Sequence, residues 1–445
     1  MQTNFTAEQL KDVHVAESEK ILRKCVHCGF CTATCPTFTL LGDELDSPRG
    51  RIYLIKDMLE NDRPADEKIV KHIDRCLSCL ACMTTCPSGV HYMHLVDHAR
   101  IHIEKTYRRP LPDRLMRAVL AFVLPYPKRF RVALIGAFFG RPLAPVLKRM
   151  GGPLTRMGAM LELAPSRAPA RGQLEGPGVF APEQSERKGR VALLSGCAQP
   201  VLNPGINDAT IRLLRRTGYE IVLPKGEVCC GALVHHMGKE EASLENARRN
   251  VDVWLEEADG EGLDAIVITA SGCGTTIKDY GFMLKDDPAY AEKAARVSAL
   301  ARDVTEFLTG IELGAPAVKP DLTVAYHSAC SMQHGQKITR QPKDLLKAAG
   351  FEVRDVPEGH LCCGSAGTYN ILQPEIARRL RDRKVANIEK TRADVIATGN
   401  IGCMTQIGLG TDMPILHTAE LLDWVYGGPQ PESLAPVLEK RAAAE

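Results

Sequence analysis

The chain lacks the sequence fingerprints with which proteins usually hold a nucleotide or a catalytic zinc ion. Its 445 residues contain no G-x-G-x-x-G after a predicted strand, no P-loop and no H-E-x-x-H motif. The formal net charge is only +2, which gives no bulk attraction to nucleic acid. These absences argue against a protein that oxidises a substrate by itself, and against a nucleic-acid-binding protein.

Targeting and membrane-spanning signals are also missing. Residues 1–20 are polar and acidic and lack the apolar segment of a secretory signal. No apolar run reaches the length that is needed to span a bilayer. Sixteen cysteines without an export signal favour metal ligands in a reducing compartment over disulfides. We therefore expect a cytoplasmic protein, held peripherally at the inner face of the cell membrane.

Eight of the cysteines form two runs with the same spacing, C-x2-C-x2-C-x3-C-P. The runs are Cys25, Cys28, Cys31, Cys35 and Cys76, Cys79, Cys82, Cys86. This spacing is typical of bacterial two-cluster ferredoxins, in which the fourth cysteine of each run ligates the other run's cluster. Zinc ribbons and disulfide frameworks fit less well, because zinc sites usually use separated C-x2-C pairs. The prediction is one [4Fe–4S] cluster on Cys25, Cys28, Cys31 and Cys86, and a second on Cys76, Cys79, Cys82 and Cys35.

The region around these runs, residues 1–106, is predicted to be a mostly helical ferredoxin domain. A short helix over 16–24 leads into the first run, and a helix over 47–59 lies between the two. Ser47 can cap the second helix, with Pro48 in its first turn. Arg49 and Arg51 could offset the negative charge of the clusters, or could belong to a solvated helix face.

Residues 107–163 are strongly basic, with two short apolar runs over 118–124 and 132–139. Eleven Lys or Arg residues stand in 107–160 against one acid, Asp113. Basic flanks around short apolar helices suit an anionic membrane surface without spanning it. Helices packed on the ferredoxin domain or on a partner subunit are an equally open interpretation. Residues 164–188, rich in Pro, Gly, Ala and Arg, are predicted to be a linker.

The remaining chain is an internal duplication, with repeats over 189–318 and 319–428 and a tail over 429–445. The segments 191–197 and 229–231 of the first repeat match 324–330 and 362–364 of the second. Each repeat alternates strand and helix patterns, which predicts a parallel sheet covered by helices. In the first repeat the expected strands are 190–194, 219–223 and 265–270. One helix is expected to begin at 203–204, and a second is expected to span 239–258. The fold class is therefore α+β and multidomain.

The other eight cysteines follow the predicted strands, four in each repeat. They are Cys197, Cys229, Cys230 and Cys273 in the first repeat, and Cys330, Cys362, Cys363 and Cys403 in the second. Ligands of parallel sheets collect at the carboxyl ends of the strands, so we expect four thiols to meet in each repeat. The cofactor stays open: an iron–sulfur cluster, a zinc ion or a reversible vicinal disulfide, with ordinary packing as the alternative.

The repeats resemble the cysteine-rich CCG domains of heterodisulfide reductase and related subunits. In that family five cysteines can hold a non-cubane cluster, and the motif ends in C-x2-C. Here Cys273 and Cys403 are followed by Thr276 and Gln406 where the fifth cysteine would stand. Several histidines lie near the motifs, namely His235, His236, His327, His334 and His360. A proton donor for a quinone or flavin edge is one interpretation, and structural histidines are the favoured one.

The segments 25–37 and 40–54 closely resemble the iron–sulfur subunit family of bacterial glycolate oxidase (glycolate dehydrogenase). The likeness covers the ferredoxin domain and both repeats. It implies a complex with flavin-binding subunits that oxidise glycolate to glyoxylate, FAD being held only on those partners. This chain would pass electrons through two [4Fe–4S] clusters towards quinone and would not be catalytic alone. Subunits of lactate and glycerol-3-phosphate dehydrogenases share this plan, and a thiol–disulfide reductase acting through the Cys-Cys-Gly motifs is a further alternative.

Overall fold

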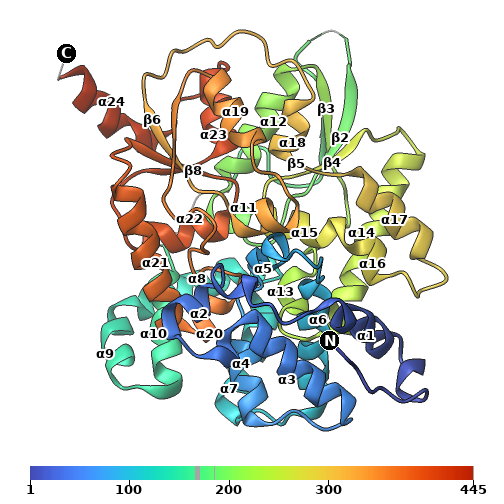
Figure 1. The fold of residues 1–445 in the computed structure, drawn as a ribbon. Helices are drawn as coiled ribbons and strands as arrows, with labels where there is room; N and C mark the ends of the chain where they lie inside the picture. The colour runs from blue at the N-terminus through green and yellow to red at the C-terminus, as the bar shows by residue number, and fades with distance from the viewer. Residues whose placement is uncertain (166–170, 185, 444–445) are drawn as a thin grey trace.

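The computed structural model describes residues 1–165, 171–184 and 186–443. The N-terminal helices form one part of the molecule, and two α/β units stand side by side against it (Figure 1). The expected α+β, multidomain fold with a helical N-terminal domain and a duplicated α/β region is confirmed.

The N-terminal domain is built from short helices around one apolar core. Its helices are α1 (Val13–Lys24), α2 (Pro36–Leu41), α3 (Pro48–Glu60), α4 (Glu67–Asp74), α5 (Ala81–Thr85) and α6 (Tyr92–Thr106), with 3-10 turns η1 (Gln9–Lys11), η2 (Phe30–Thr32) and η3 (Glu44–Asp46). Helix α3 begins where the sequence predicts, because the Ser47 hydroxyl accepts a hydrogen bond from the Gly50 N–H at 2.9 Å. Leu22, Ile55 and Leu95 are fully buried in the core between α1, α3 and α6.

The basic segment is helical, as expected, but longer helices form than the sequence indicated. Its elements are α7 (Leu111–Val123), α8 (Pro127–Gly140), η4 (Arg141–Leu143), α9 (Ala144–Arg149) and α10 (Gly152–Leu163). The helical stretch 127–149 has 23 residues and, by length and composition alone, could cross a membrane; only 6% of its most apolar window is buried. The expectation that no apolar run reaches spanning length was therefore wrong, because the helix continues through Arg141 and joins two apolar pieces.

Part of the basic charge in this segment lies inside the protein. The Arg109 and Arg117 side chains are each 7% exposed and donate to the Asp74 carboxylate at 2.6 and 2.9 Å. Both also contact Asp113, which Arg156 approaches at 2.6 Å. Arg109 and Arg117 therefore tie α7 to Asp74 of α4, and Arg156 ties α10 to α7. The buried Arg109 and Arg117 are not available to an external surface.

The first repeat contains a five-stranded sheet in the order β1-β3-β2-β4-β5. Its strands are β1 (Gly178–Phe180), β2 (Gly189–Leu193), β3 (Tyr219–Leu223), β4 (Ala265–Ile268) and β5 (Ala301–Asp303). All neighbours are parallel except β1, which pairs antiparallel with β3. The segment 164–188 is therefore more than a linker, because 178–180 extends the sheet; residues 166–170 and 185 of that prediction lie outside the described residues.

The second repeat has the same parallel topology without the antiparallel edge strand, in the order β7-β6-β8-β9. Its strands are β6 (Thr323–Tyr326), β7 (Glu352–Asp355), β8 (Val395–Thr398) and β9 (Ile415–His417). The predicted parallel sheets are thus confirmed in both repeats. Strands β2 and β6 occupy equivalent positions in the two sheets. Each lies between the strand that precedes the Cys-Cys-Gly motif of its repeat and the strand that precedes the last cysteine.

A shared helical layer lies between the two sheets (Figure 1). It consists of α12 (Gly205–Arg216), α18 (Val304–Thr309), α19 (Gln341–Ala348) and α23 (Thr418–Val425). The largest apolar core joins both sheets through these helices, including Val191, Val267, Val324 and Val395, all fully buried. The repeats therefore form one body and not two independent domains.

The remaining helices cover the other faces of the sheets and connect them to the ferredoxin domain. They are α11 (Gln199–Leu202), α13 (Ala232–His235), α14 (Glu240–Asp259), α15 (Ser271–Lys278), α16 (Tyr280–Met283), α17 (Ala291–Leu300), η5 (Ser331–Gly335), α20 (Tyr369–Leu372), α21 (Pro374–Glu389), α22 (Ile401–Gly408), η6 (Glu432–Leu434) and α24 (Ala435–Ala442). The tail predicted over 429–445 packs back on the repeats, because Leu434 is fully buried in the shared core; residues 444–445 lie outside the described chain.

Candidate metal centres

The two N-terminal cysteine runs fold into the same kind of loop. In the first loop His27 and Gly29 have φ values of 55° and 85°, and in the second Ser78 and Leu80 have values of 49° and 63°. These left-handed residues flank the second cysteine of each run and reverse the backbone on both sides of it. For a residue such as Leu80 this conformation costs about 1 kcal/mol or more, so other interactions must hold the loop in it.

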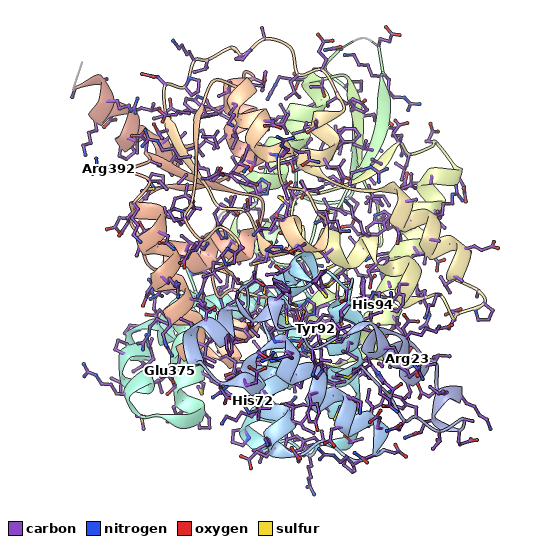
Figure 2. The ribbon with its side chains drawn as sticks, in the orientation of Figure 1. Arg23, His72, Tyr92, His94, Glu375 and Arg392 are labelled. Atoms are coloured by element: carbon purple, nitrogen blue, oxygen red, sulfur yellow. The ribbon has the colours of Figure 1, made fainter. Side chains whose placement is uncertain are left out.

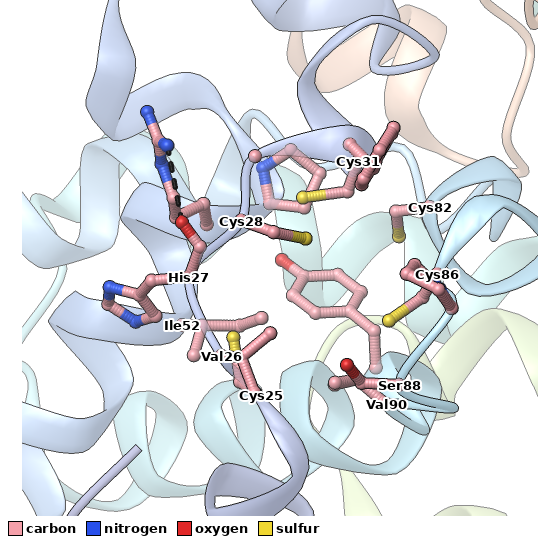
Figure 3. A pocket seen from close by; sticks show the side chains of 16 residues that line it. Cys25, Val26, His27, Cys28, Cys31, Ile52, Cys82, Cys86, Ser88 and Val90 are labelled. Carbon is pink, nitrogen blue, oxygen red and sulfur yellow. Dashed lines mark hydrogen bonds between the residues drawn. The ribbon is translucent and has the colours of Figure 1, made fainter.

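The first loop surrounds a small cavity of about 30 Å³ that the exposed Cys28 borders (Figure 3). Cys25, Cys28 and Cys31 line it from the first run, and Cys86 lines it from the second. The four thiols that the spacing assigns to one cluster therefore surround one space. Cys82 of the second run also reaches the wall of this cavity.

The second loop surrounds a cavity of about 20 Å³, whose lining residues Cys35, Arg51 and Cys76 are buried. Cys76, Cys79 and Cys82 line it, together with Cys35 of the first run. The fourth cysteines are thus exchanged between the two runs, as the ferredoxin spacing predicts. Because Cys82 lines both cavities, the two spaces adjoin.

The donors of both cavities suit iron. They are thiols, the soft ligands that select iron–sulfur clusters, zinc or copper(I). Burial raises the pKa of the Cys31 thiol to about 11, and that of the Cys82 thiol well above its usual value. Such thiols ionise only when a cationic centre takes up their charge. When bound, a [4Fe–4S] cluster in each cavity would supply one-electron transfer.

Arg51 supplies positive charge at the second cavity. Its side chain is 1% exposed, and its guanidinium lies 3.8 Å from Cys35 Sγ. It donates to Thr37 Oγ1 at 3.0 Å and to the His72 carbonyl at 2.7 Å. Burial alone would lower the pKa of Arg51, but the charges of Cys76 and its neighbours raise it overall. Of the two interpretations of Arg51, the structure favours charge compensation.

Arg49, in contrast, is a partly exposed residue at the first cavity. Its Nη1 donates to the His27 carbonyl at 3.5 Å, and its Nε donates to Glu44 at 2.8 Å. The side chain is 35% exposed, so solvent screens much of its charge. Arg49 therefore fits the solvated interpretation better than Arg51 does.

Two groups at the second cavity were not predicted from the sequence. Tyr92, 3% exposed, places its hydroxyl 3.8 Å from Cys76 Sγ. Asp46 is fully buried and accepts from His72 Nδ1 at 2.9 Å and from Arg75 Nη1 at 2.7 Å. Figure 2 shows Tyr92 and His72 inside the helical domain. No periodicity or motif marks these residues, because their role depends on contacts between helices.

The first repeat brings its thiols to the carboxyl end of the sheet. Cys197 follows β2, Cys229 and Cys230 follow β3, and Cys273 lies at the start of α15 after β4. The Cys197 and Cys229 sulfurs are 3.5 Å apart. Hydrogen bonds with the Cys197 and Cys230 thiols hold the pKa of the Cys229 thiol well below its usual value. The expected gathering of thiols is therefore present at this edge.

The second repeat gathers its four cysteines at the equivalent edge, with every thiol buried. Cys330 interacts with Cys362, Cys362 with Cys363, and Cys363 with Cys403. The side chains of these residues are between 0% and 7% exposed. His327 joins them, since one ring nitrogen lies within 4.8 Å of both Cys363 Sγ and Cys403 Sγ.

Most of the other candidate histidines connect the ferredoxin domain to the repeats. His235 Nε2 lies 3.3 Å from the buried Asp97 of α6, and His236 lies 3.8 Å from the same carboxylate. His334 Nδ1 is 2.7 Å from Thr84 Oγ1 of α5, and its Nε2 is 3.4 Å from the His360 carbonyl. These contacts support the structural interpretation of the histidines, with His327 as the exception.

Family comparisons agree with this division of the chain. Residues 21–90 match a family model described as a 4Fe-4S dicluster domain. Residues 191–278 and 324–408 match a model described as a cysteine-rich domain.

Several known proteins are similar to this chain over much of its length. A protein of Escherichia coli K12 named "Glycolate oxidase iron-sulfur subunit" is 43% identical over 95% of this chain and 98% of its own length. A Bacillus subtilis protein named "Probable glycolate oxidase iron-sulfur subunit" is 32% identical over 94% and 98%. Lactate utilization protein A of Bacillus licheniformis is 30% identical over 53% of this chain and 99% of its own. A hypothetical protein from Helicobacter pylori shares the fold, with a TM-score of 0.53 at 10% identity over 95% of this chain and 74% of that structure.

Proposed function

Because the chain belongs to the family of glycolate oxidase iron–sulfur subunits, we propose that it takes electrons from a flavin-binding partner subunit and delivers them towards membrane quinone. The observation that carries this proposal is the pair of adjoining cysteine cavities, the first bordered by the exposed Cys28 and the second lined by the buried Cys35 and Cys76. Glycolate would be oxidised on the partner, which holds the FAD, and this chain would not be catalytic alone. Each [4Fe–4S] cluster would be held by the first three cysteines of one run and the fourth cysteine of the other.

The first cavity gives the proposed side of electron entry. Cys28 is exposed there, and the apolar side chains of Val26, Phe30 and Tyr53 are 67%, 64% and 57% exposed. The ring of His27, which follows Val26 in the chain, lies 6.4 Å from the ring of Tyr53. Exposed aromatic residues beside a cluster cavity are typical anchors of a protein interface. We propose that the flavin subunit docks on this apolar group, where a flavin can approach the first cavity.

Glycolate is expected to reduce the iron–sulfur clusters of this chain only when the flavin subunits are present. The measurement is EPR of the anaerobically assembled complex before and after addition of glycolate, with lactate and glycerol 3-phosphate as competing substrates. Replacing Val26 and Phe30 together by Glu should slow cluster reduction at least about tenfold, because charges would be buried at the interface.

The matched control is Val179→Glu, at an equally exposed position (59%) on the edge strand β1. It should leave cluster reduction unchanged. If lactate or glycerol 3-phosphate reduced the clusters and glycolate did not, the substrate assignment would be lost. Normal reduction in the Val26 and Phe30 double variant would place the flavin subunit on another surface.

The proposed membrane contact is the apolar face of the stretch 127–149. Val132, Ile135 and Phe139 on α8 are 69%, 56% and 76% exposed, and Leu143 and Val146 continue the face at 58% and 55%. Exposed apolar side chains that follow one another along a helix in this way usually mark a surface that binds a membrane or another protein. Basic residues border it on both sides, including Lys128, Arg129, Arg141 and Arg149. Apolar residues flanked by Lys and Arg suit an anionic lipid surface, so we propose a peripheral location at the inner face of the cell membrane.

The complex is expected to bind vesicles of mixed neutral and anionic lipid and to be released partly by salt. Replacing Ile135, Phe138 and Phe139 together by Ser should weaken binding at least about tenfold, since each side chain contributes about 1.5–3 kcal/mol when buried in lipid. Co-sedimentation with vesicles measures the effect. Val13→Ser, 49% exposed on α1, is the control and should bind as the wild type does. If the triple variant sedimented with vesicles as the wild type does, this face would not be the membrane contact. A partner subunit would then be its expected occupant.

A further inference from the structure

The second repeat contains a fifth metal donor that the first repeat does not have. His327 directly follows β6, is 1% exposed, and is held by a hydrogen bond from its backbone N–H to the Ala397 carbonyl at 2.9 Å. Its Nε2 is buried and has no hydrogen-bond partner among the described residues. A ring nitrogen of this imidazole lies within 4.8 Å of the sulfurs of Cys363 and Cys403. An unpaired buried nitrogen costs free energy unless something else, such as a metal ion, binds it.

The thiols beside His327 are supported as ligands. The Gly364 N–H donates to Cys362 Sγ at 3.4 Å, and Asn400 Nδ2 donates to Cys403 Sγ at 3.3 Å. Hydrogen bonds of this kind orient ligating sulfurs and stabilise their ionised form. The site therefore has an outer shell as well as donors.

A buried cation compensates the charge of this site. Lys384 of α21 is 2% exposed, and its ammonium donates to the Glu358 carbonyl at 2.9 Å. It lies close enough to Cys330, Cys362 and Cys363 to interact with their charges. A buried ammonium beside neutral thiols would be costly, whereas beside a thiolate-bound centre it is paired.

The duplication supplies an internal comparison. In the matched segments 191–197 and 324–330, Leu194 occupies the place of His327. The Cys-Cys-Gly glycines approach equivalent helix positions, Gly231 against Ser243 and Gly364 against Ala377. Seven residues further along each helix stand Asn250 and Lys384. The second site therefore has an imidazole and an ammonium where the first has an aliphatic and a neutral amide side chain.

The second site also adjoins the second ferredoxin cavity. Cys79 and Leu77 of that cavity pack in one apolar cluster with Cys330 and Cys362. The Cys79 thiol is close enough to Cys330 and Cys362 for their charges to interact. Electrons leaving the second ferredoxin cavity would therefore meet this site next.

We propose that His327 is a ligand of a third redox centre, an iron–sulfur cluster held together with Cys330, Cys362, Cys363 and Cys403. Five buried donors at one edge of the sheet exceed the four that a structural zinc ion takes. Imidazole in place of thiolate raises the potential of an iron–sulfur centre, which suits an acceptor of electrons from the ferredoxin domain. The role as acceptor rests on the proposed function; the ligation by His327 does not.

The test replaces His327 by Leu, the residue of the first repeat, in the full chain purified anaerobically. Iron, sulfide and zinc are quantified per chain, and the clusters are followed by EPR during a redox titration. The variant should lose the iron of one centre and its EPR signal, while both ferredoxin signals remain. His327→Cys should keep the iron and move the midpoint potential of that signal to a lower value.

Equal iron and an identical titration in the wild type and both variants would overturn the proposal. So would stoichiometric zinc, or a Cys362–Cys363 disulfide, in place of iron in the second repeat. Failure of glycolate to reduce the wild-type complex would reject the proposed function. The difference in iron content between the wild type and the His327→Leu variant would remain, so the two failures are distinguishable. His327→Cys keeps the proposal testable if the Leu variant does not fold.

Discussion

Replacing Cys86 by Ser is expected to remove about four iron atoms per chain, those of the cluster bound by the first cysteine run. The reason is geometric, because Cys86 faces the cavity of Cys25, Cys28 and Cys31 although it belongs to the other run (Figure 3). A serine at this corner leaves the cluster with three thiolates and one much weaker ligand. Iron and sulfide quantitation of the anaerobically purified chain measures the loss.

Double variants show which cysteines share a cluster, since two changes at one cluster cannot remove it twice. Cys25→Ser with Cys86→Ser should lose no more iron than either single variant. Cys25→Ser with Cys35→Ser should lose about eight iron atoms, because Cys35 lines the other cavity. The opposite pattern, with Cys25 and Cys86 additive, would show that each run binds its own cluster and would refute the exchange.

Arg51→Leu is expected to destabilise the ferredoxin domain by about 3–5 kcal/mol and to cause loss of the second cluster. The change removes the guanidinium from Cys35 and from Asp46, which is fully buried. Removing one partner of a buried charged group costs about 3–5 kcal/mol. Asp46 keeps Arg75 at 2.7 Å, so the charge left without its partner is that of the thiolate cluster beside Cys35. Denaturant unfolding under anaerobic conditions measures the stability, and iron analysis measures the cluster.

The matched control is Arg49→Leu, two residues earlier on the same helix. Its guanidinium pairs with Glu44 at a partly exposed position, so the expected loss is about 1 kcal/mol or less, with normal iron content. Arg51→Lys keeps a positive charge but not the forked set of hydrogen bonds. Its loss of stability should lie between the losses of Arg49→Leu and Arg51→Leu. If the Arg49 and Arg51 variants were equally stable, charge compensation at the second cavity would be wrong.

Much of the fold could be predicted from the sequence because it depends on interactions between residues that are close in the chain. Ser47 and Pro48 begin α3 because a hydroxyl cap and a proline in the first turn act within one turn of helix. Strand β3 was predicted at its observed bounds, Tyr219–Leu223, because it is a short apolar run between turn residues. The exchange of cysteines between cavities follows from their spacing, since three ligands two residues apart leave the fourth corner for another segment.

Contacts between distant segments decided the remainder. The edge strand β1 was hidden in a linker-like composition, because pairing with β3 and not local preference makes it a strand. The exposed stretch 127–149 was underestimated because the helical turn at Arg141–Leu143 joins the short apolar run 132–139 to the apolar residues of α9. Arg49 and Arg51 have the same chemistry in the sequence, and only the packing of α3 buries one of them.

By itself, the sequence determined the two cluster-binding loops, the duplicated parallel sheets and the meeting of thiols at their carboxyl ends, because spacing and periodicity act over a few residues. Only the tertiary structure decided which charges are buried beside those thiols. His327, directly after β6, and Lys384 of α21 lie 57 positions apart in the chain, and both lie near Cys363. Burial is a property of the packed molecule, and no local pattern in the chain encodes it.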